Sequence, residues 1–155
     1  MISIVIPVYN EEEVLEKNLE KLHAFLSQKP NRPFEILVVD NGSIDKTPEI
    51  ARRIQSGSAW FRYFQIPERS VGKAFARGVR EARYDFIVSQ DADLSTNLDF
   101  IDEAEHLLQI SSMVVGSKTL GNQKRSLTRV IGSQVYLAIT QMLFRMTLTD
   151  FSMGA

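Results

Sequence analysis

The most informative stretch of the chain is Phe86-Ile87-Val88-Ser89-Gln90-Asp91-Ala92-Asp93-Leu94-Ser95, an apolar run that ends at two carboxylates. The run predicts a buried strand, and a turn at its end can aim Asp91 and Asp93 at one point. Hard cations such as Mg²⁺ or Mn²⁺ prefer oxygen ligands, and substrate phosphates commonly complete their coordination. The position after a strand therefore favours a metal–diphosphate site over the alternative, a solvated and capped turn.

Length and composition indicate one globular domain. The chain has 155 residues, of which 44% are apolar and 24% are charged, so it can bury a core of its own. Because it contains no cysteine, disulfides, thiol nucleophiles and cysteine-bound metals are excluded. The N-terminus lacks the basic region and cleavage site of a signal peptide, so we interpret it as a first strand.

The formal net charge of −1 conceals a basic segment in the second half of the chain. Residues 116–149 contain no acid and have basic side chains at Lys118, Lys124, Arg125, Arg129 and Arg145. Such a segment can face a phosphate or an anionic membrane surface. The alternative is a basic surface loop that has no partner.

Strands alternate with helices along the chain, which predicts an α/β fold with a mostly parallel sheet and helices on both faces. The expected strands are 2–8, 34–39, 60–66, 85–90 and 112–117, and the expected helices begin after Asn10, near Thr47, and at 72–82, 98–109 and 130–148. Ligands of such sheets bind beyond the carboxyl ends of the strands. Three polar turns, at 9–11, 40–43 and 91–95, fall at strand ends and are therefore the expected site.

Two common nucleotide-binding signatures are missing from the sequence. No G-x-G-x-x-G follows a strand, and no G-x-x-x-x-G-K-[ST] is present, so neither the dinucleotide fingerprint nor the P-loop is supported. His23 and His106 lie on expected helices far from the polar turns, and we expect both to be structural or solvated. No serine–histidine–acid constellation is evident, so the catalytic residue is left unassigned.

Five motifs occur in order over residues 2–118, namely Pro7-Val8-Tyr9-Asn10-Glu11, Val38-Val39-Asp40-Asn41-Gly42-Ser43-Ile44-Asp45-Lys46-Thr47, Gly72-Lys73-Ala74, Arg77-Gly78 and Asp91-Ala92-Asp93. Together they resemble the large inverting family 2 of glycosyltransferases, whose members have the Rossmann-like GT-A fold. The stretches 91–95 and 150–155 are most similar to the dolichyl- or polyprenyl-phosphate mannosyl- and glucosyltransferases of that family.

The resemblance implies a donor site for a sugar nucleotide and a divalent metal ion. Asp91 and Asp93 would bind Mg²⁺ or Mn²⁺ together with the diphosphate, and Tyr9 would stack on the base. The whole set of implied donor-binding residues is Pro7, Tyr9, Glu11, Val39, Asp40, Asn41, Lys73, Asp91, Ala92, Asp93 and Lys118.

Three positions depart from the family pattern. Asn41 stands where many members have a second aspartate, which keeps hydrogen bonding and loses a charge. Ser95 replaces a frequent glutamine and is a poorer metal ligand. Lys118 replaces an arginine of the polyprenyl-phosphate subgroup, and its point charge weakens the case for bidentate phosphate binding.

The reaction implied by the resemblance is inverting transfer of a hexose from a nucleotide-diphosphate sugar, of the GDP-mannose or UDP-glucose type, to a polyprenyl phosphate. Such an acceptor needs no general base, because its oxygen is already ionised near neutral pH. One alternative is a glycosyltransferase with a saccharide acceptor, and another is a non-catalytic nucleotide-sugar-binding fragment. A nucleotidyltransferase is disfavoured because no glycine-rich phosphate loop follows the first strand.

We interpret residues 1–118 as the nucleotide-sugar-binding core and residues 119–155 as the start of an acceptor- or membrane-facing region that is C-terminally incomplete. The apolar stretch 130–148 is either an amphipathic helix at the bilayer surface or a core helix that covers the sheet. A lipid acceptor implies a location at the cytoplasmic face of a membrane, with peripheral contact. A nucleic-acid partner is not expected.

Overall fold

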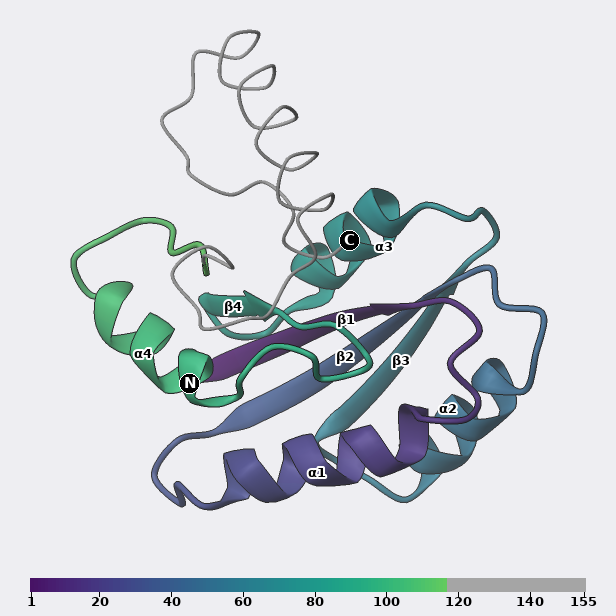
Figure 1. The fold of residues 1–155 in the computed structure, drawn as a ribbon, viewed down its shortest axis with the longest axis horizontal. Helices are drawn as coiled ribbons and strands as arrows, with labels where there is room; N and C mark the ends of the chain where they lie inside the picture. Colours follow the sequence, from purple (N-terminus) through teal and green to yellow (C-terminus); the bar gives the residue numbers. More distant parts are fainter. Residues whose placement is uncertain (117–155) are drawn as a thin grey trace, which may run out of the picture. The chain divides into compact units, whose positions relative to one another are not determined.

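A computed structural model describes residues 1–116 of the chain, and residues 1–109 form one compact unit (Figure 1). Strands and helices alternate throughout this unit, as the sequence predicts. The elements are β1 (Ile2–Val8), α1 (Leu15–Ser27), β2 (Phe34–Asn41), α2 (Thr47–Ser56), β3 (Phe61–Ile66), α3 (Val71–Glu81), β4 (Phe86–Ser89) and α4 (Asp99–Leu107).

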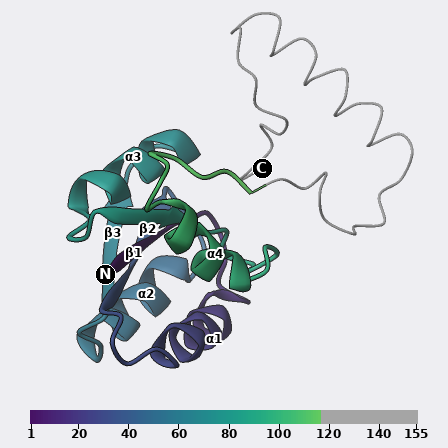
Figure 2. The ribbon, with the colours of Figure 1, turned by 90° about the vertical axis from the view of Figure 1, so that its left-hand side faces the viewer.

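The four strands form one parallel sheet in the order β3-β2-β1-β4. β1 pairs with β2 along its full length, from Ile2 opposite Phe34 to Val8 opposite Asp40. Helices α1 and α2 cover one face of the sheet and α3 covers the other, as the two views in Figures 1 and 2 show. Because all strands run the same way, the segments that follow them emerge at one edge of the sheet.

The main core lies between the sheet and α1. Alternate residues of β1 (Ile2, Ile4 and Ile6) point to this face, because successive side chains of a strand point to opposite sides. They pack against a helical stripe made of Leu15, Leu19, Leu22 and Leu26, each at most 2% exposed. Ile101 of α4 is fully buried in the same cluster, so α4 also belongs to this layer.

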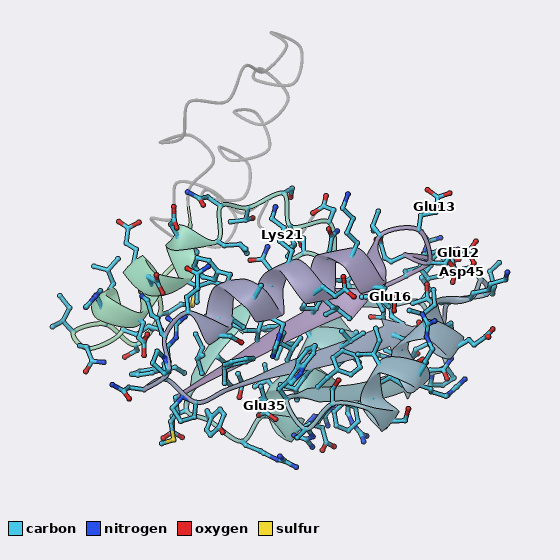
Figure 3. All side chains as sticks on the ribbon, turned by 90° about the horizontal axis from the view of Figure 1, so that it is seen from below. Glu12, Glu13, Glu16, Lys21, Glu35 and Asp45 are labelled. Atoms are coloured by element: carbon cyan, nitrogen blue, oxygen red, sulfur yellow. The ribbon has the colours of Figure 1, made fainter. Side chains whose placement is uncertain are left out.

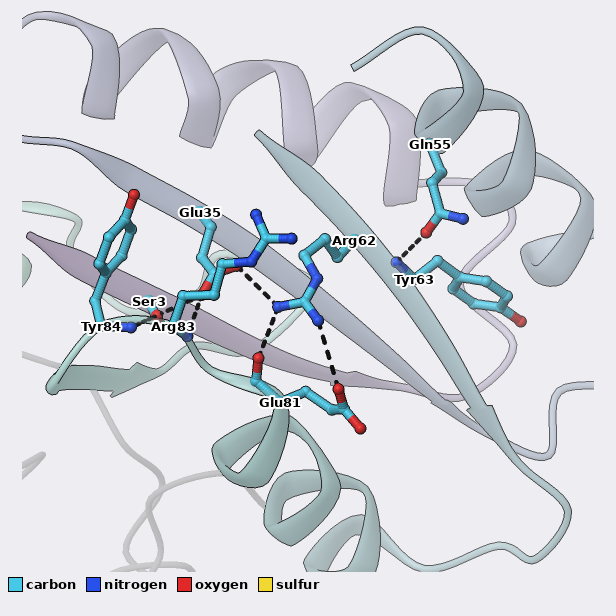
Figure 4. A network of polar contacts seen from close by, with 8 residues as sticks. All are labelled: Ser3, Glu35, Gln55, Arg62, Tyr63, Glu81, Arg83 and Tyr84. Atoms are coloured by element: carbon cyan, nitrogen blue, oxygen red, sulfur yellow. Dashed lines mark hydrogen bonds and ion pairs between the residues drawn. The ribbon is translucent and has the colours of Figure 1, made fainter. Parts of the chain in front are cut away.

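A buried polar network holds together the amino edge of the sheet, which is the edge where the four parallel strands begin (Figure 4). The Glu35 carboxylate, at the start of β2, accepts hydrogen bonds from Ser3 Oγ at 2.8 Å, the Arg83 backbone N–H at 2.6 Å and Arg62 Nη1 at 3.1 Å. Arg62 also donates to the backbone oxygen of Glu81, where α3 ends. The network ties three strands to the end of α3, and the carboxylate is stabilised despite its burial because it accepts several hydrogen bonds.

On its other face the sheet meets α3 at a glycine. A Cβ placed on Gly78 would lie 2.3 Å from Cγ1 and 3.2 Å from Cγ2 of Val5, and 3.3 Å from Cγ2 of Val39. Real Cβ atoms essentially never approach another heavy atom as closely as 2.3 Å, so only glycine lets α3 lie at its present distance from β1 and β2. Ala74, one turn earlier, is also fully buried against the sheet.

Four of the five expected strands are confirmed, and the differences lie at element ends. The fifth expected strand is wrong for residues 112–116, which pair with no strand in the described part of the chain. The first helix begins at Leu15, several residues after Asn10, which has a left-handed φ of 55°. Thr47 does not cap α2, because its hydroxyl accepts a hydrogen bond from the Glu11 backbone instead.

Residues 117–155, which include Lys118, the basic cluster and the apolar stretch 130–148, lie outside the described residues. Within residues 1–116, no helix has the length and hydrophobicity needed to cross a bilayer. The interpretation of 119–155 as an acceptor- or membrane-facing region therefore stays a prediction.

We expect Gly78→Ala to lower the free energy of unfolding by about 1–3 kcal/mol, because the added methyl group overpacks the contact with Val5. Helix propensity alone would favour alanine by about 1 kcal/mol. Gly72→Ala, in the same helix but with nothing within 4 Å of the new Cβ, is the matched control and should be neutral or stabilising. Urea unfolding of both variants would test this, and a Gly78→Ala protein as stable as the parent would contradict it.

Candidate functional site

Three turns at the carboxyl edge of the sheet contain residues with left-handed backbone conformations. Asn10 after β1 has a φ of 55°, Gly42 after β2 has a φ of 87°, and Leu94 after β4 has a φ of 51°. Such a conformation costs a non-glycine residue about 1–2 kcal/mol, and strained residues persist where surrounding contacts hold them. The three polar turns predicted from the sequence are therefore also where the described backbone is most constrained.

The turns after β1 and β2 are tied together by reciprocal hydrogen bonds. The Asn10 backbone N–H donates to Ser43 Oγ at 2.9 Å, and Asn10 Oδ1 accepts from the Ile44 backbone at 3.0 Å. The Glu11 N–H donates to Thr47 Oγ1 at 2.8 Å.

A second set of contacts joins the start of α1 to the residues before α2. The Glu12 N–H donates to Asp45 Oδ2 at 3.1 Å, and the two residues lie side by side in Figure 3. Glu12 Oε2 accepts in return from the Lys46 backbone at 2.8 Å. Burial alone would raise the pKa of Asp45, but hydrogen bonds from Thr47 and Glu12 lower it instead.

Asp40 and Val39 lie inside the protein beneath these turns. Asp40 is fully buried, and its two carboxylate oxygens accept from the Ser43 backbone and from the Tyr63 hydroxyl, each at 2.8 Å. Burial and the hydrogen bond to Asp40 both raise the pKa of the Tyr63 phenol. Val39 is fully buried on the face that α3 covers. In this structure both residues support the turn from below.

Asn41 has a buried acceptor without a partner. Its side chain is 1% exposed, and Nδ2 donates to the Val8 carbonyl at 2.7 Å. That bond sets the orientation of the amide, because only the nitrogen can donate to a carbonyl. Oδ1 therefore remains an acceptor, and it has no hydrogen-bond partner among residues 1–116. An unsatisfied buried group costs about 1–3 kcal/mol, which a donor on a ligand could recover.

The turn that carries Asp91 and Asp93 is held from within and from α1. The Leu94 N–H donates to the Asp91 carbonyl at 3.1 Å, and the Ser95 N–H donates to Asp93 Oδ1 at 2.9 Å. Asn18 of α1 donates from Nδ2 to the Ala92 carbonyl at 2.9 Å, between the two aspartates. Ala92 is 7% exposed and packs in the core, so the short residue between the carboxylates anchors the turn.

Glu11 extends this acidic site from the neighbouring turn. Burial, the negative charge of Asp93 and that of Asp45, in this order, raise the pKa of the Glu11 carboxyl. β1 pairs with β4 in parallel, so the turns after these two strands leave the sheet at the same edge and next to each other. The half-buried carboxylates of Glu11 and Asp91 and the exposed carboxylate of Asp93 make this region negative, which suits a hard divalent cation.

No group of three or more His, Cys, Asp or Glu residues within residues 1–116 is arranged to hold a metal ion alone. Mg²⁺ is commonly bound by one or two carboxylates plus substrate phosphates. Asp91 and Asp93 stay the predicted metal ligands.

The remaining predicted residues that the structure describes, Pro7, Tyr9 and Lys73, lie around the same edge. Pro7 is half-buried opposite Val39, and Lys73 is exposed in the first turn of α3, where it pairs with Glu68 at 2.8 Å. Tyr9 is half-buried, and the guanidinium carbon of Arg69 lies 4.1 Å from the centre of its ring.

Three residues at this edge escaped the sequence analysis: Asn18, Tyr63 and Arg69. Asn18 carried a usable signal, because it is a polar residue beside the leucine stripe of α1 and so needs a partner. Tyr63 and Arg69 carried none, because strand tyrosines and loop arginines are common.

The family of the chain follows from a comparison with known families. The model of the family described as Glycosyl transferase family 2 matches residues 3–146, which is most of the chain. The chain belongs to glycosyl transferase family 2. The family predicted from the five motifs is thereby confirmed.

Two curated relatives of the chain are named for a polyprenyl phosphate. The chain is 32% identical over 143 residues to the dolichyl-phosphate beta-glucosyltransferase of Drosophila melanogaster. This match covers 88% of this chain and 41% of that protein. It is 32% identical over 148 residues to the undecaprenyl-phosphate 4-deoxy-4-formamido-L-arabinose transferase of Pectobacterium atrosepticum, covering 94% of this chain and 44% of that protein. The chain thus spans less than half the length of these relatives.

A similar solved structure supports the fold. The mannosyltransferase PcManGT from Pyrobaculum calidifontis, in complex with GDP-Man and Mn2+, matches 69% of this chain and 32% of that chain, with a TM-score of 0.54 and 26% identity. The predicted α/β fold of the GT-A type, a parallel sheet with helices on both faces, is confirmed.

We expect Asn18→Ala to lower the free energy of unfolding by about 1–3 kcal/mol, because the Ala92 carbonyl loses its donor. The backbone amides of Leu94 and Ser95 should also exchange faster with deuterium, since the turn loses its tether to α1. Asn31→Ala, at an exposed position before β2, is the matched control. Unchanged exchange at Leu94 in the Asn18→Ala protein would show that other contacts hold the turn.

We expect Glu11→Gln to stabilise the fold near neutral pH. Because the folded-state pKa of Glu11 is raised, ionisation of its carboxyl costs stability, and this cost appears as pH rises through the folded-state pKa. The gain in melting temperature from Glu11→Gln should therefore grow between about pH 4 and pH 7. Glu13→Gln, which removes an exposed charge from the same turn, is the control and should change stability less. A gain at pH 4 as large as at pH 7 would contradict this interpretation.

Proposed function

We propose that this chain is the donor-binding part of a metal-dependent inverting glycosyltransferase. It would take a hexose from a nucleotide-diphosphate sugar, of the GDP-mannose or UDP-glucose type, and transfer it to a polyprenyl phosphate. The observation that carries the proposal is the convergence of Glu11, Asn41 and the Asp91–Asp93 turn at one edge of a parallel sheet. This edge is where α/β folds bind ligands.

The donor would lie across the turns after β1, β2 and β4. Tyr9 offers an aromatic face for the base, and the buried Oδ1 of Asn41 offers an acceptor for an N–H or hydroxyl of the nucleoside. The half-buried Glu11 would accept from a ribose hydroxyl, and Lys73 would face the phosphates if its pair with Glu68 opened. Asp40 and Val39 would act from beneath, by holding the turn in shape.

Asp91 and Asp93 would hold Mg²⁺ or Mn²⁺ against the diphosphate. When bound, the ion neutralises the negative charge that develops on the departing nucleoside diphosphate. Support comes from the carboxylate pair in a tethered turn and from the similar mannosyltransferase structure that was solved with GDP-Man and Mn2+. Nothing among residues 1–116 distinguishes Mg²⁺ from Mn²⁺, since both prefer carboxylate oxygens.

A polyprenyl phosphate is the proposed acceptor because two relatives are named as dolichyl-phosphate and undecaprenyl-phosphate transferases. A phosphate acceptor also agrees with the lack of an assigned general base in this chain. Such a lipid would place the protein at a membrane, for which we propose the cytoplasmic face. Lys118 and the basic segment that follows are the proposed contacts, and a saccharide acceptor is the alternative.

We expect Asp91→Asn and Asp93→Asn each to weaken Mn²⁺-dependent binding of UDP or GDP by more than about tenfold. Even an outer-shell partner of a metal ligand typically contributes 10–100-fold. Asp85→Asn, an exposed carboxylate before β4, is the matched control and should bind like the parent. Calorimetric titration of the whole chain with each nucleotide, with and without Mn²⁺, would measure this.

The same titrations include the results that would overturn the proposal. If the parent chain binds neither UDP nor GDP in the presence of Mn²⁺ or Mg²⁺, the proposed donor site is wrong. If binding is unchanged by either aspartate substitution, the nucleotide site can stand but the metal assignment cannot.

A further inference from the structure

Helix α3 carries positive charge on a domain that is otherwise acidic. Residues 69–83, which comprise α3 and its two ends, contain 5 basic side chains and 1 acidic side chain. The rest of residues 1–116 contains 8 basic and 17 acidic side chains. Because α3 lies on one face of the sheet and α1 and α2 lie on the other, this positive charge is confined to one face (Figures 1 and 2). Such an uneven distribution orients a protein in the field of a charged surface.

The outward side of α3, which faces away from the sheet, combines apolar and basic side chains. Val71 and Val79 are 53% and 37% exposed, and the half-buried Phe75 lies between them at a spacing of four residues, so the three follow one side of the helix. Arg77 and Arg80 are exposed on the other side. An apolar stripe next to a basic one is the pattern of helices that lie at a membrane surface.

Two arginines near the end of α3 have exposed side chains with little counter-charge. Among residues 1–116, the Arg80 side chain bonds only to the Ala76 carbonyl of its own helix and pairs with no acid. The Arg83 backbone N–H donates to the buried Glu35 carboxylate at 2.6 Å, as Figure 4 shows. The Arg83 side chain is 64% exposed, and its Nε lies 4.0 Å from that carboxylate. The backbone of Arg83 is therefore fixed while its guanidinium reaches solvent.

The acidic side chain of this segment is already shared between two other arginines. Glu81 pairs with Arg62 at 3.4 Å and with Arg77 at 3.0 Å. On α2, by contrast, Arg53 has an acidic partner of its own, because it pairs with Glu16 of α1 at 2.6 Å. Within the described part of the chain, the positive charge at the end of α3 is thus not compensated locally.

We propose that the outward side of α3, together with Arg83, is the surface by which this domain docks on an anionic lipid bilayer. The guanidinium groups of Arg80 and Arg83 contact lipid phosphates, and Val71 and Val79 enter the headgroup region. The proposal rests on the proposed function, because a polyprenyl-phosphate acceptor lies in a membrane. It deepens that function by assigning the face that meets the membrane and the orientation of the domain.

Docking through α3 also places the proposed donor site beside the bilayer. α3 follows β3 directly, so its first turn lies at the carboxyl edge of the sheet, together with the turns after β1, β2 and β4. With α3 along the membrane surface, this edge opens along the surface, where the phosphate of a membrane lipid lies. The acidic remainder of the domain is repelled by anionic headgroups, which disfavours other orientations.

We expect the double variant Arg80→Gln, Arg83→Gln of the whole chain to bind vesicles that contain phosphatidylglycerol about 10- to 30-fold more weakly than the parent. The reason is that each basic residue near an anionic surface contributes about fivefold. Binding of the parent should need the anionic lipid and should weaken as salt is raised. Co-sedimentation with vesicles measures these affinities, and a melting temperature like that of the parent would show that the variant is folded.

The double variant Arg52→Gln, Arg53→Gln is the matched control. It removes the same charge from exposed positions of α2, on the face of the sheet opposite α3, and it should bind vesicles like the parent.

The chain contains no cysteine, so a single introduced thiol can report the orientation of the domain. Ala76→Cys on the outward side of α3 and Glu20→Cys on α1 both replace exposed residues. Each would be labelled with a fluorophore whose emission shifts to the blue in an apolar environment. On anionic vesicles, the label at position 76 should shift and the label at position 20 should not.

Each other result overturns the docking surface. Unchanged vesicle binding in the α3 variant, an equal loss in the α2 variant, or an equal shift of both labels would mean that α3 does not face the bilayer. Binding to neutral vesicles as strong as to anionic ones would exclude recognition by charge. If the parent does not bind anionic vesicles even at low salt, the lipid surface is wrong and an acidic protein becomes the partner to test.

Failure of this proposal is distinguishable from failure of the proposed function. The nucleotide titrations of the parent chain are made without lipid. Nucleotide binding without vesicle binding leaves the donor site in place, and vesicle binding through α3 without nucleotide binding leaves the docking surface in place.

Discussion

The pairing of β1 with β2 is the constraint on which the site depends. Their register puts Val8 opposite Asp40, so the chain leaves both strands at the same level of the sheet. With this register, the turns that follow the two strands lie next to each other, so that Asn10 can hydrogen-bond to Ser43 and Ile44. A slip of one residue would turn every side chain of a strand to the other face, which would exchange the α1 core for the α3 contact. Core packing and site geometry are therefore set by the same register.

Buried polar groups occur at both edges of the sheet. At the amino edge, the buried Glu35 carboxylate has hydrogen-bond donors from Ser3, Arg62 and Arg83, and this satisfied network rigidifies the scaffold. Four buried side-chain atoms have no partner among the described residues: Nε and Nη2 of Arg32 at the amino edge, and Asn41 Oδ1 and Gln90 Nε2 at the carboxyl edge. Because such atoms occur at both edges, they do not by themselves mark the binding site.

Local patterns were sufficient to predict most of the scaffold. The leucine spacing of α1, the apolar runs of four strands and the order of the elements all follow from side-chain periodicity, which needs no tertiary information. The motifs likewise pointed to the family, because their order and spacing are joint constraints. The expected strand at 112–117 failed for its described residues, which pair with none of the strands within residues 1–116. An apolar run by itself does not say whether a partner strand will lie beside it.

Tertiary structure decided which polar residues point into the site and which support it from below. Asp40 and Asn41 are neighbours with similar side chains, yet one has both oxygens bonded inside the protein and the other retains a buried, unpartnered acceptor. Adjacent residues of a strand face opposite ways, so each meets a different set of neighbours. The same holds for Arg69 and Tyr9, which are 60 positions apart and meet because β3 lies beside β2. Side-chain type and spacing were readable from the chain, whereas these partners depend on strand order and helix placement.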